Sequence, residues 1–354
     1  MTGWEKESVD LINDGLFQIT DPGPLHAPIH KFSIRRDETL ALILETEAAP
    51  DAKSSAAQHP SGTVRLNTEK VELVNIAKIK ATLTGVQTYS VTTSHDGPRR
   101  SALKELARVH RTNVTLTDPK SAAYTIEWLE NLPASPFLWP DTINTVKETT
   151  ITRRIALTDG GITLSGSDKR EGFDNAAAAL NIANQLLYVC ALTPSDAEAG
   201  IKPGCIIYTG TPDELARKRI RTALSFALGV YLVELGHTVY DEKWDIVLSA
   251  SHSAYSLGRK AFDLAPMPLA PLGKRFQYEI GRPELTRMVS ALVENYDALD
   301  LGNLSWAYWH ACAATVHIAP AHFGAAIEAL QRAYIKKSPD AITSTILVAA
   351  KWED

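Results

Sequence analysis

The sequence has few cysteines, and their arrangement excludes the sites that cysteine usually builds. Its 354 residues include only Cys190, Cys205 and Cys312, which lie far apart and form no CxxC pair. They therefore supply neither a zinc knuckle nor a disulfide framework. We expect three small, buried apolar residues.

Several motifs with a known chemistry are also missing. There is no GxxxxGK[ST], and no GxGxxG follows a strand-like segment, so nucleotide-driven chemistry has no support. HExxH and GxSxG are absent, so a helix-borne metalloprotease has no support and no serine or cysteine sits in a nucleophile elbow. The sequence gives no reason to expect a cofactor or a bound metal.

Strong charge and long apolar runs are lacking as well. A formal net charge of −5 argues against a broad nucleic-acid surface, although a local basic patch is compatible with it. No uninterrupted apolar segment approaches the roughly 18 residues that cross a bilayer. The N-terminus is acidic where a signal peptide is basic and then apolar. We expect a cytoplasmic protein with no membrane partner.

What is present indicates an α+β protein with two parts, because single cores stop growing above about 250 residues. We expect a β-rich, sandwich-like part with one or two helices over residues 1–205. A mainly α-helical part should follow over residues 206–354.

The N-terminal part has short runs rich in threonine and valine, which are typical of strands. We expect a polar loop over Glu47–Gly62, a helix over Ser101–His110 and an alanine-rich helix over Ala176–Leu192. Asp159-Gly160-Gly161, between two apolar runs, predicts a hairpin.

In the C-terminal part, Thr211 and Pro212 predict the start of a helix that runs to about Glu234 and ends at Gly236. Strands are then expected at His237–Tyr240 and Ile246–Ala250. One helix is expected to begin at Pro283 and to end near Leu301-Gly302. Three more helices are expected, over Leu304–Val316, Phe323–Lys336 and Ala341–Lys351.

Histidines supply the first candidate catalytic group. His310 and His317 are separated by seven positions on a predicted helix, so their side chains share one face. Two helical turns place them about 10.5 Å apart along the helix axis, which is too far for both to bind one metal ion directly. His322, beyond Pro320, can fold back, and Glu328 can add a carboxylate. The alternative is that these are packed or surface residues, since H-x6-H is no recognised ligand spacing.

His237, Asp241 and His252 form a second candidate, in which an aspartate orients a histidine base. The ordinary alternative is a polar rim at the edge of two strands.

A basic cluster, Arg217, Lys218 and Arg221, is the candidate nucleic-acid site, with Arg217 and Arg221 on one helix face. The alternative is a solvated face opposite the apolar residues of the same helix. Trp306 and Trp309 are candidates for an interface or for helix packing.

The segment Ile206–Gly273, with IIYTGTP, RKRIRTALSFALGVYLVELGHTVYDEKWDIV and APMPLAPLG, resembles the middle of bacterial abortive-infection-type proteins. These carry a β-rich N-terminal domain and a HEPN-type helical domain. Phe323–Leu330 (FGAAIEAL) resembles a helix of that domain.

The resemblance implies a role in antiviral defence, with RNA cleaved by an arginine and a histidine in an R-x4-6-H arrangement. The sequence departs from that pattern, because no such motif follows Glu328 and no histidine follows His322. Either the catalytic region lies beyond Asp354 in a longer chain, or this is a non-cleaving member.

Three hypotheses follow. The first is a non-enzymatic recognition or scaffold module that binds a protein partner, itself or RNA. The second is a metal-assisted hydrolase or ribonuclease that uses His310, His317 and Glu328. The third is a structural protein that forms oligomers through Trp306 and Trp309.

Overall fold

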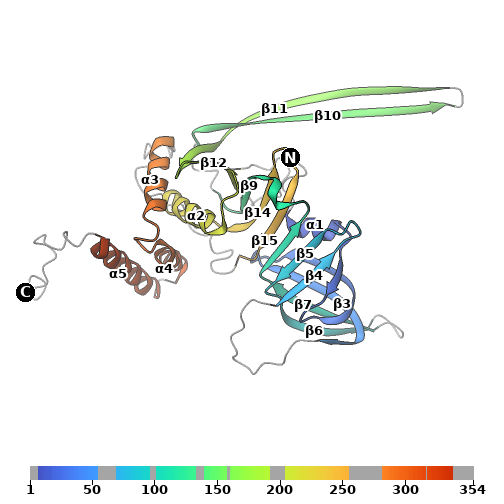
Figure 1. Ribbon diagram of the computed structural model, residues 1–354, viewed down its shortest axis with the longest axis horizontal. Helices are drawn as coiled ribbons and strands as arrows, with labels where there is room; N and C mark the ends of the chain where they lie inside the picture. The colour runs from blue at the N-terminus through green and yellow to red at the C-terminus, as the bar shows by residue number, and fades with distance from the viewer. Residues whose placement is uncertain are drawn as a thin grey trace, which may run out of the picture.

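A computed structural model describes residues 7–54, 69–95, 101–132, 139–157, 160–191, 204–254, 281–315 and 317–337. It confirms the α+β class, because antiparallel sheets dominate the N-terminal region and helices gather toward the C-terminus (Figure 1). The predicted helix Ala341–Lys351 lies outside the described residues.

Eleven described strands form one antiparallel sheet that runs through most of the molecule. Its strand order is β1-β4-β5-β8-β15-β14-β9-β13-β12-β11-β10. The bounds are β1 Gln18–Asp21, β4 Lys70–Val74, β5 Lys80–Thr84, β8 Arg111–Thr115, β9 Ala122–Leu129, β10 Asp141–Leu157, β11 Gly160–Ile182, β12 Gln185–Ala191, β13 Gly204–Thr209, β14 Glu234–Asp241 and β15 Ile246–His252.

A second antiparallel sheet, in the order β2-β3-β7-β6, packs against one end of the first. Its strands are β2 His26–Arg36, β3 Leu42–Ser54, β7 Ser101–Val109 and β6 Gln87–His95, and helix α1 (Ser8–Asp14) joins the same core. Ile34, Leu44, Leu73, Leu83 and Val109 are buried between the two sheets. The sandwich-like N-terminal part is therefore present.

At the other end of the long sheet, helices α2 (Glu214–Leu228) and α3 (Arg282–Glu294) cover strands β9, β13, β12 and β11. Leu180, Leu187 and Ile206 of the sheet meet Leu224 of α2 and Leu285 of α3 in one apolar core. Helices α4 (Leu301–Ala313) and α5 (Ala319–Lys337) follow, with Trp309 of α4 buried against the chain after α2. A 3-10 turn, Pro119–Ser121, precedes β9.

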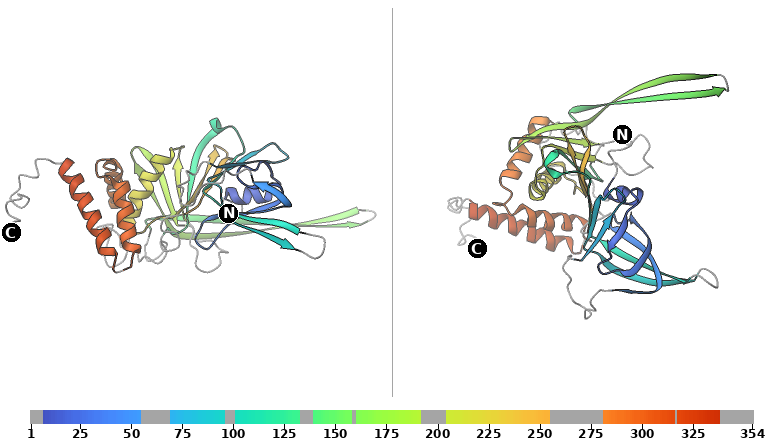
Figure 2. Two further views of the ribbon diagram at one scale, coloured as in Figure 1. Left: turned by 90° about the horizontal axis from the view of Figure 1, so that it is seen from below. Right: turned by 45° about the vertical axis from the view of Figure 1, so that its right-hand side comes forward.

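The predicted hairpin at Gly160 is confirmed, and it is much longer than the sequence indicates. Strands β10 and β11 stay paired from Asp141↔Ala177 to Leu157↔Gly160. They project from the molecule on the side opposite the C-terminal helices (Figure 2).

Two predicted helices are strands. Ser101–His110 coincides with β7, which pairs with both β3 and β6, and Ala176–Leu192 covers the end of β11 and all of β12. Ladder pairing overrides the helix preference of alanine and leucine in both segments. Burial adds to it: β7 lies in the core between the two sheets, and β11 and β12 lie under α2 and α3. Glu47–Ser54, expected to be loop, belongs to β3 and is held by its pairing with β2.

The boundary expected between residues 205 and 206 falls inside β13. Strands β14 and β15, which follow it, pair within the same sheet as the N-terminal strands β8 and β9. The opposed cysteines Cys190 and Cys205 are both buried, as expected, on adjacent strands. Among the described residues, no helix is long and apolar enough to cross a membrane.

Candidate functional site: a buried polar cluster and an adjoining pocket

Helix α2 buries charge as well as apolar side chains. It begins after Asp213, whose carboxylate accepts a hydrogen bond of 2.7 Å from the Ala216 N–H, and it ends at Gly229 in a left-handed conformation. Ile220 and Leu224 pack into the core. The helix therefore starts two residues later than expected and stops before Glu234, which belongs to β14.

Arg217 and Arg221 share one face of α2, as predicted, but that face points toward the sheet. Arg217 is only 5% exposed, and the Arg221 side chain is 17% exposed, so the expected solvated face is wrong for these two residues. With Glu127, Glu234, His237 and His252 they form a buried polar cluster.

Two carboxylates hold Arg221 in this cluster. Glu127 of β9 is fully buried, forms an ion pair with Arg221 and accepts a 2.7 Å hydrogen bond from the Tyr208 hydroxyl. Glu234 Oε2 lies 2.8 Å from Arg221 Nη2. A buried guanidinium requires such partners, because an unpaired buried charge costs several kcal/mol, on the order of 3–5.

Two histidines complete the cluster. His237 Nδ1 lies 3.4 Å from Arg217 Nη2, and His252 Nδ1 lies 3.6 Å from Glu234 Oε1. The two rings are nearly perpendicular, with centroids 5.8 Å apart. His252 Nε2 is buried and has no hydrogen-bond partner among the described residues.

A bulge in β14 brings Glu234 and His237 to the same face of the sheet. Residues three apart in a regular strand point to opposite faces, but the register of β14 against β9 shifts between Glu234 and Gly236. Gly236 has φ +151°, and a Cβ there would stand 2.0 Å from the Ala250 carbonyl oxygen. Only glycine fits this conformation and this close contact.

The surroundings set the protonation of these groups. Burial, reinforced by Arg217, lowers the pKa of His237 to about 2, and burial lowers the pKa of His252 to about 4. Burial opposes ionisation of Glu234, but the positive charge of Arg221, with that of Arg217, outweighs it and lowers the pKa of that carboxyl. At neutral pH the cluster holds two neutral imidazoles and an ionised carboxylate.

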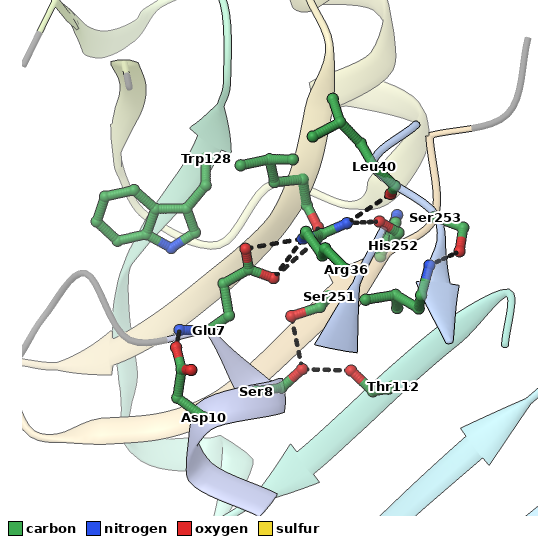
Figure 3. A network of polar contacts seen from close by, with 12 residues as sticks. Glu7, Ser8, Asp10, Arg36, Leu40, Thr112, Trp128, Ser251, His252 and Ser253 are labelled. Atoms are coloured by element: carbon green, nitrogen blue, oxygen red, sulfur yellow. Dashed lines mark hydrogen bonds and ion pairs between the residues drawn. The ribbon is translucent and has the colours of Figure 1, made fainter. Parts of the chain in front are cut away.

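Arg36 of β2 anchors the strands of the cluster from the side of α1 (Figure 3). Its guanidinium donates to the Glu7 carboxylate and to the carbonyl oxygens of Leu40, Leu235 and His252, at 2.6–3.0 Å. Two of these carbonyls belong to β14 and β15. The contact therefore holds the strand segments that carry Glu234 and His252.

A pocket of about 230 Å³ adjoins the cluster between α2 and α4. Arg221 belongs to both, since it lines the pocket while its guanidinium reaches the carboxylates. We call it the α2–α4 pocket. Its lining residues are Lys218, Arg221, Thr222, Ser225, Tyr231, Leu232, Gly302, Ser305, Trp306, Trp309 and His310.

The pocket joins residues that the sequence singled out for different reasons. Lys218 and Arg221 stand on α2, and Trp306, Trp309 and His310 stand on α4. Trp306 is 57% exposed, with its ring 4.3 Å from that of His310. Trp309 is 2% exposed and packs in a core, so only Trp306 presents an open surface.

The candidate catalytic set of His310, His317 and Glu328 does not come together. Helix α4 ends at Ala313, so His317 lies in the turn before α5, not on the helix that carries His310. Glu328 is on α5 and pairs with Arg332. In the described part of the chain, the one group of three residues with metal-ligating geometry is Glu234, His237 and His252.

Of the second sequence candidate, His237 and His252 meet, but Asp241 does not join them. Its carboxylate instead accepts hydrogen bonds from the backbone N–H groups of Lys243 and Asp245 in the β14–β15 turn. Sequence reasoning missed Glu127 and Glu234. A glutamate between the apolar neighbours Ile126 and Trp128 was the available signal for Glu127.

No protein-family model matches the chain, and no curated protein has significant sequence similarity to it.

Proposed function

We propose that the chain is a cytoplasmic, non-enzymatic recognition module of the HEPN-like defence type. We further propose that its ligand is a phosphate-bearing nucleotide, supplied by single-stranded RNA, bound in the α2–α4 pocket. The observation that carries this proposal is the meeting of cationic and exposed aromatic side chains at one pocket.

The chemistry of the pocket suits that ligand. The Lys218 ammonium is exposed and forms no ion pair with the described residues, so its charge is open to a phosphate. Across the pocket, the exposed Trp306 indole offers a face on which a base can stack. Thr222, Ser225 and Ser305 add hydroxyl groups. A volume of about 230 Å³ is on the scale of a single base or phosphate, below that of typical drug-sized sites.

The test is fluorescence anisotropy with a 5′-phosphorylated single-stranded RNA of about eight nucleotides. Lys218→Ala and Trp306→Ala should each weaken binding about fivefold or more, because each removes one phosphate or stacking contact. Lys243→Ala and Trp244→Ala are matched controls, since both residues are exposed in the β14–β15 turn.

The RNA should be recovered intact on a denaturing gel. Unchanged affinity in both pocket variants, or no binding by the native protein, would contradict the site. RNA cleavage that is lost in His310→Ala would contradict the non-enzymatic role.

A specific observation also favours the oligomer hypothesis, although not through Trp309. Helix α5 exposes Phe323, Ile327, Leu330 and Tyr334, at spacings of four, three and four. Such a stripe is the seam along which two identical helices pack. The experiment on it is given in the Discussion at the scale of the whole molecule.

A further inference from the structure

The buried polar cluster contains three side chains arranged as metal ligands. Glu234, His237 and His252 each offer one ligand atom, and these atoms lie within 4.8 Å of one another. Two imidazoles and one carboxylate form a common ligand set for zinc and other divalent transition metals. Bonds of 2.0–2.1 Å require ligand atoms about 3.3 Å apart. The set must therefore contract slightly around an ion.

Rigid strands hold these ligands, and this favours a defined site. Glu234 and His237 flank the Gly236 bulge on β14, and His252 stands on the adjacent strand β15. The Arg36 guanidinium fixes the backbone at Leu235 and at His252 through their carbonyl oxygens. The ligands thus meet without the ordering of a loop.

One histidine of the set has a nitrogen atom with no other partner. The Nε2 of His252 is buried and forms no hydrogen bond with the described residues. A buried polar atom without a partner is uncommon in folded proteins, and a bound ion is one way to satisfy it.

The neighbouring arginines oppose a cation, and their charge must be balanced. Glu127 and Glu234 offset the charges of Arg217 and Arg221, so the cluster is neutral before an ion enters. A dication then leaves surplus positive charge. An anion such as hydroxide or phosphate at an open coordination position would compensate it.

An ion can reach the cluster from the solvent. The side chains of Glu234 and His252 are 16% and 14% exposed. Arg221, which lies against Glu234, is also part of the wall of the α2–α4 pocket.

We propose that Glu234, His237 and His252 bind one divalent transition-metal ion of the zinc class. The three protein ligands leave at least one position for an exogenous anion. This site is separate from the RNA contacts of Lys218 and Trp306, so either proposal can fail without the other.

The experiment uses the full chain, stripped of metal, with Co²⁺ as a spectroscopic probe and Zn²⁺ as the competitor. Cobalt should give the visible ligand-field bands of a four- or five-coordinate site with nitrogen and oxygen ligands, and one equivalent of zinc should abolish them. Calorimetry with Zn²⁺ alone should give a stoichiometry near one.

Glu234→Gln and His252→Ala should each weaken zinc binding about tenfold or more. His30→Ala removes an exposed histidine on β2 and should leave affinity unchanged. Circular dichroism checks that each variant is folded.

If a ligand variant fails to fold, the native protein still decides the question. The proposal would be overturned if the native protein showed neither the cobalt ligand-field bands nor a calorimetric heat of zinc binding. It would also be overturned if both folded ligand variants bound zinc as tightly as the native protein. Zinc binding that is lost in His30→Ala would assign the ion to the surface instead.

Discussion

At the scale of single residues, two basic side chains at adjacent positions of α2 lie in opposite environments. Arg217 is buried beside His237, while Lys218, the next residue, is exposed at the pocket. Helical geometry separates them, because successive residues point in directions about 100° apart. A basic run in sequence is therefore divided between an internal network and a surface site.

Glu130, just after β9, is another buried carboxyl group, and it predicts a dependence of stability on pH. The residue is 7% exposed, and burial, with the nearby Glu7 carboxylate, raises its pKa to about 7 from 4.5. Between these two pH values the folded state holds a proton that the unfolded state has released. Stability contributed by Glu130 is therefore complete below pH 4.5 and is lost as pH rises to 7.

Glu130→Gln should remove this loss of stability at high pH, since glutamine has a shape similar to that of glutamate and does not ionise. We expect it to raise the free energy of unfolding at pH 8 by up to about 3 kcal/mol, with little effect at pH 4.5. Urea unfolding at both pH values measures this. Glu72→Gln, at an exposed position of β4, is the control. Equal changes at the two pH values would show that folding does not raise the pKa of Glu130.

At the scale of elements, strand β14 depends on one irregularity. The bulge at Gly236 turns Glu234 and His237 to one face, and a Cβ at Gly236 would collide with the backbone of β15. Gly236→Ala should lower the free energy of unfolding by about 3 kcal/mol or more. Thermal or urea unfolding measures the change, and zinc binding should be lost with the bulge.

Gly324→Ala is the matched control for this prediction. Gly324 lies within α5, and a Cβ there meets nothing within 4 Å. Alanine is the better helix former, so the variant should gain about 0.5–1 kcal/mol. A similar loss in both variants would show that the bulge carries no special strain.

At the scale of the whole molecule, α5 carries an apolar face that the other described elements leave exposed. Helix α5 packs against α4, where the ring of Phe323 lies 6.1 Å from that of Tyr308, and Ala326 is buried. Phe323 nevertheless stays partly exposed, as do Ile327, Leu330 and Tyr334. Light scattering after size exclusion should therefore find a dimer at micromolar concentration. Ile327→Asp should weaken the dimer at least about tenfold by burying a charge in the seam.

Ala325→Asp adds the same charge at an exposed position of α5 outside the stripe and should leave the dimer intact. A native protein that is monomeric at 100-fold higher concentration would contradict self-association through α5.

Local sequence was sufficient for the α+β class, the Gly160 hairpin, strands β14 and β15 and most helices after residue 281. These depend on turn residues, caps and short-range periodicity, which act within one element.

Tertiary structure decided that Ala176–Leu192 forms strands, because pairing and burial outweigh alanine's helix preference. It also decided the site: β9, α2, β14 and β15 bring together Glu127, Arg221, Glu234 and His252, which are up to 125 residues apart in sequence. Such long-range contacts depend on sheet order and a bulge, which no local pattern specifies.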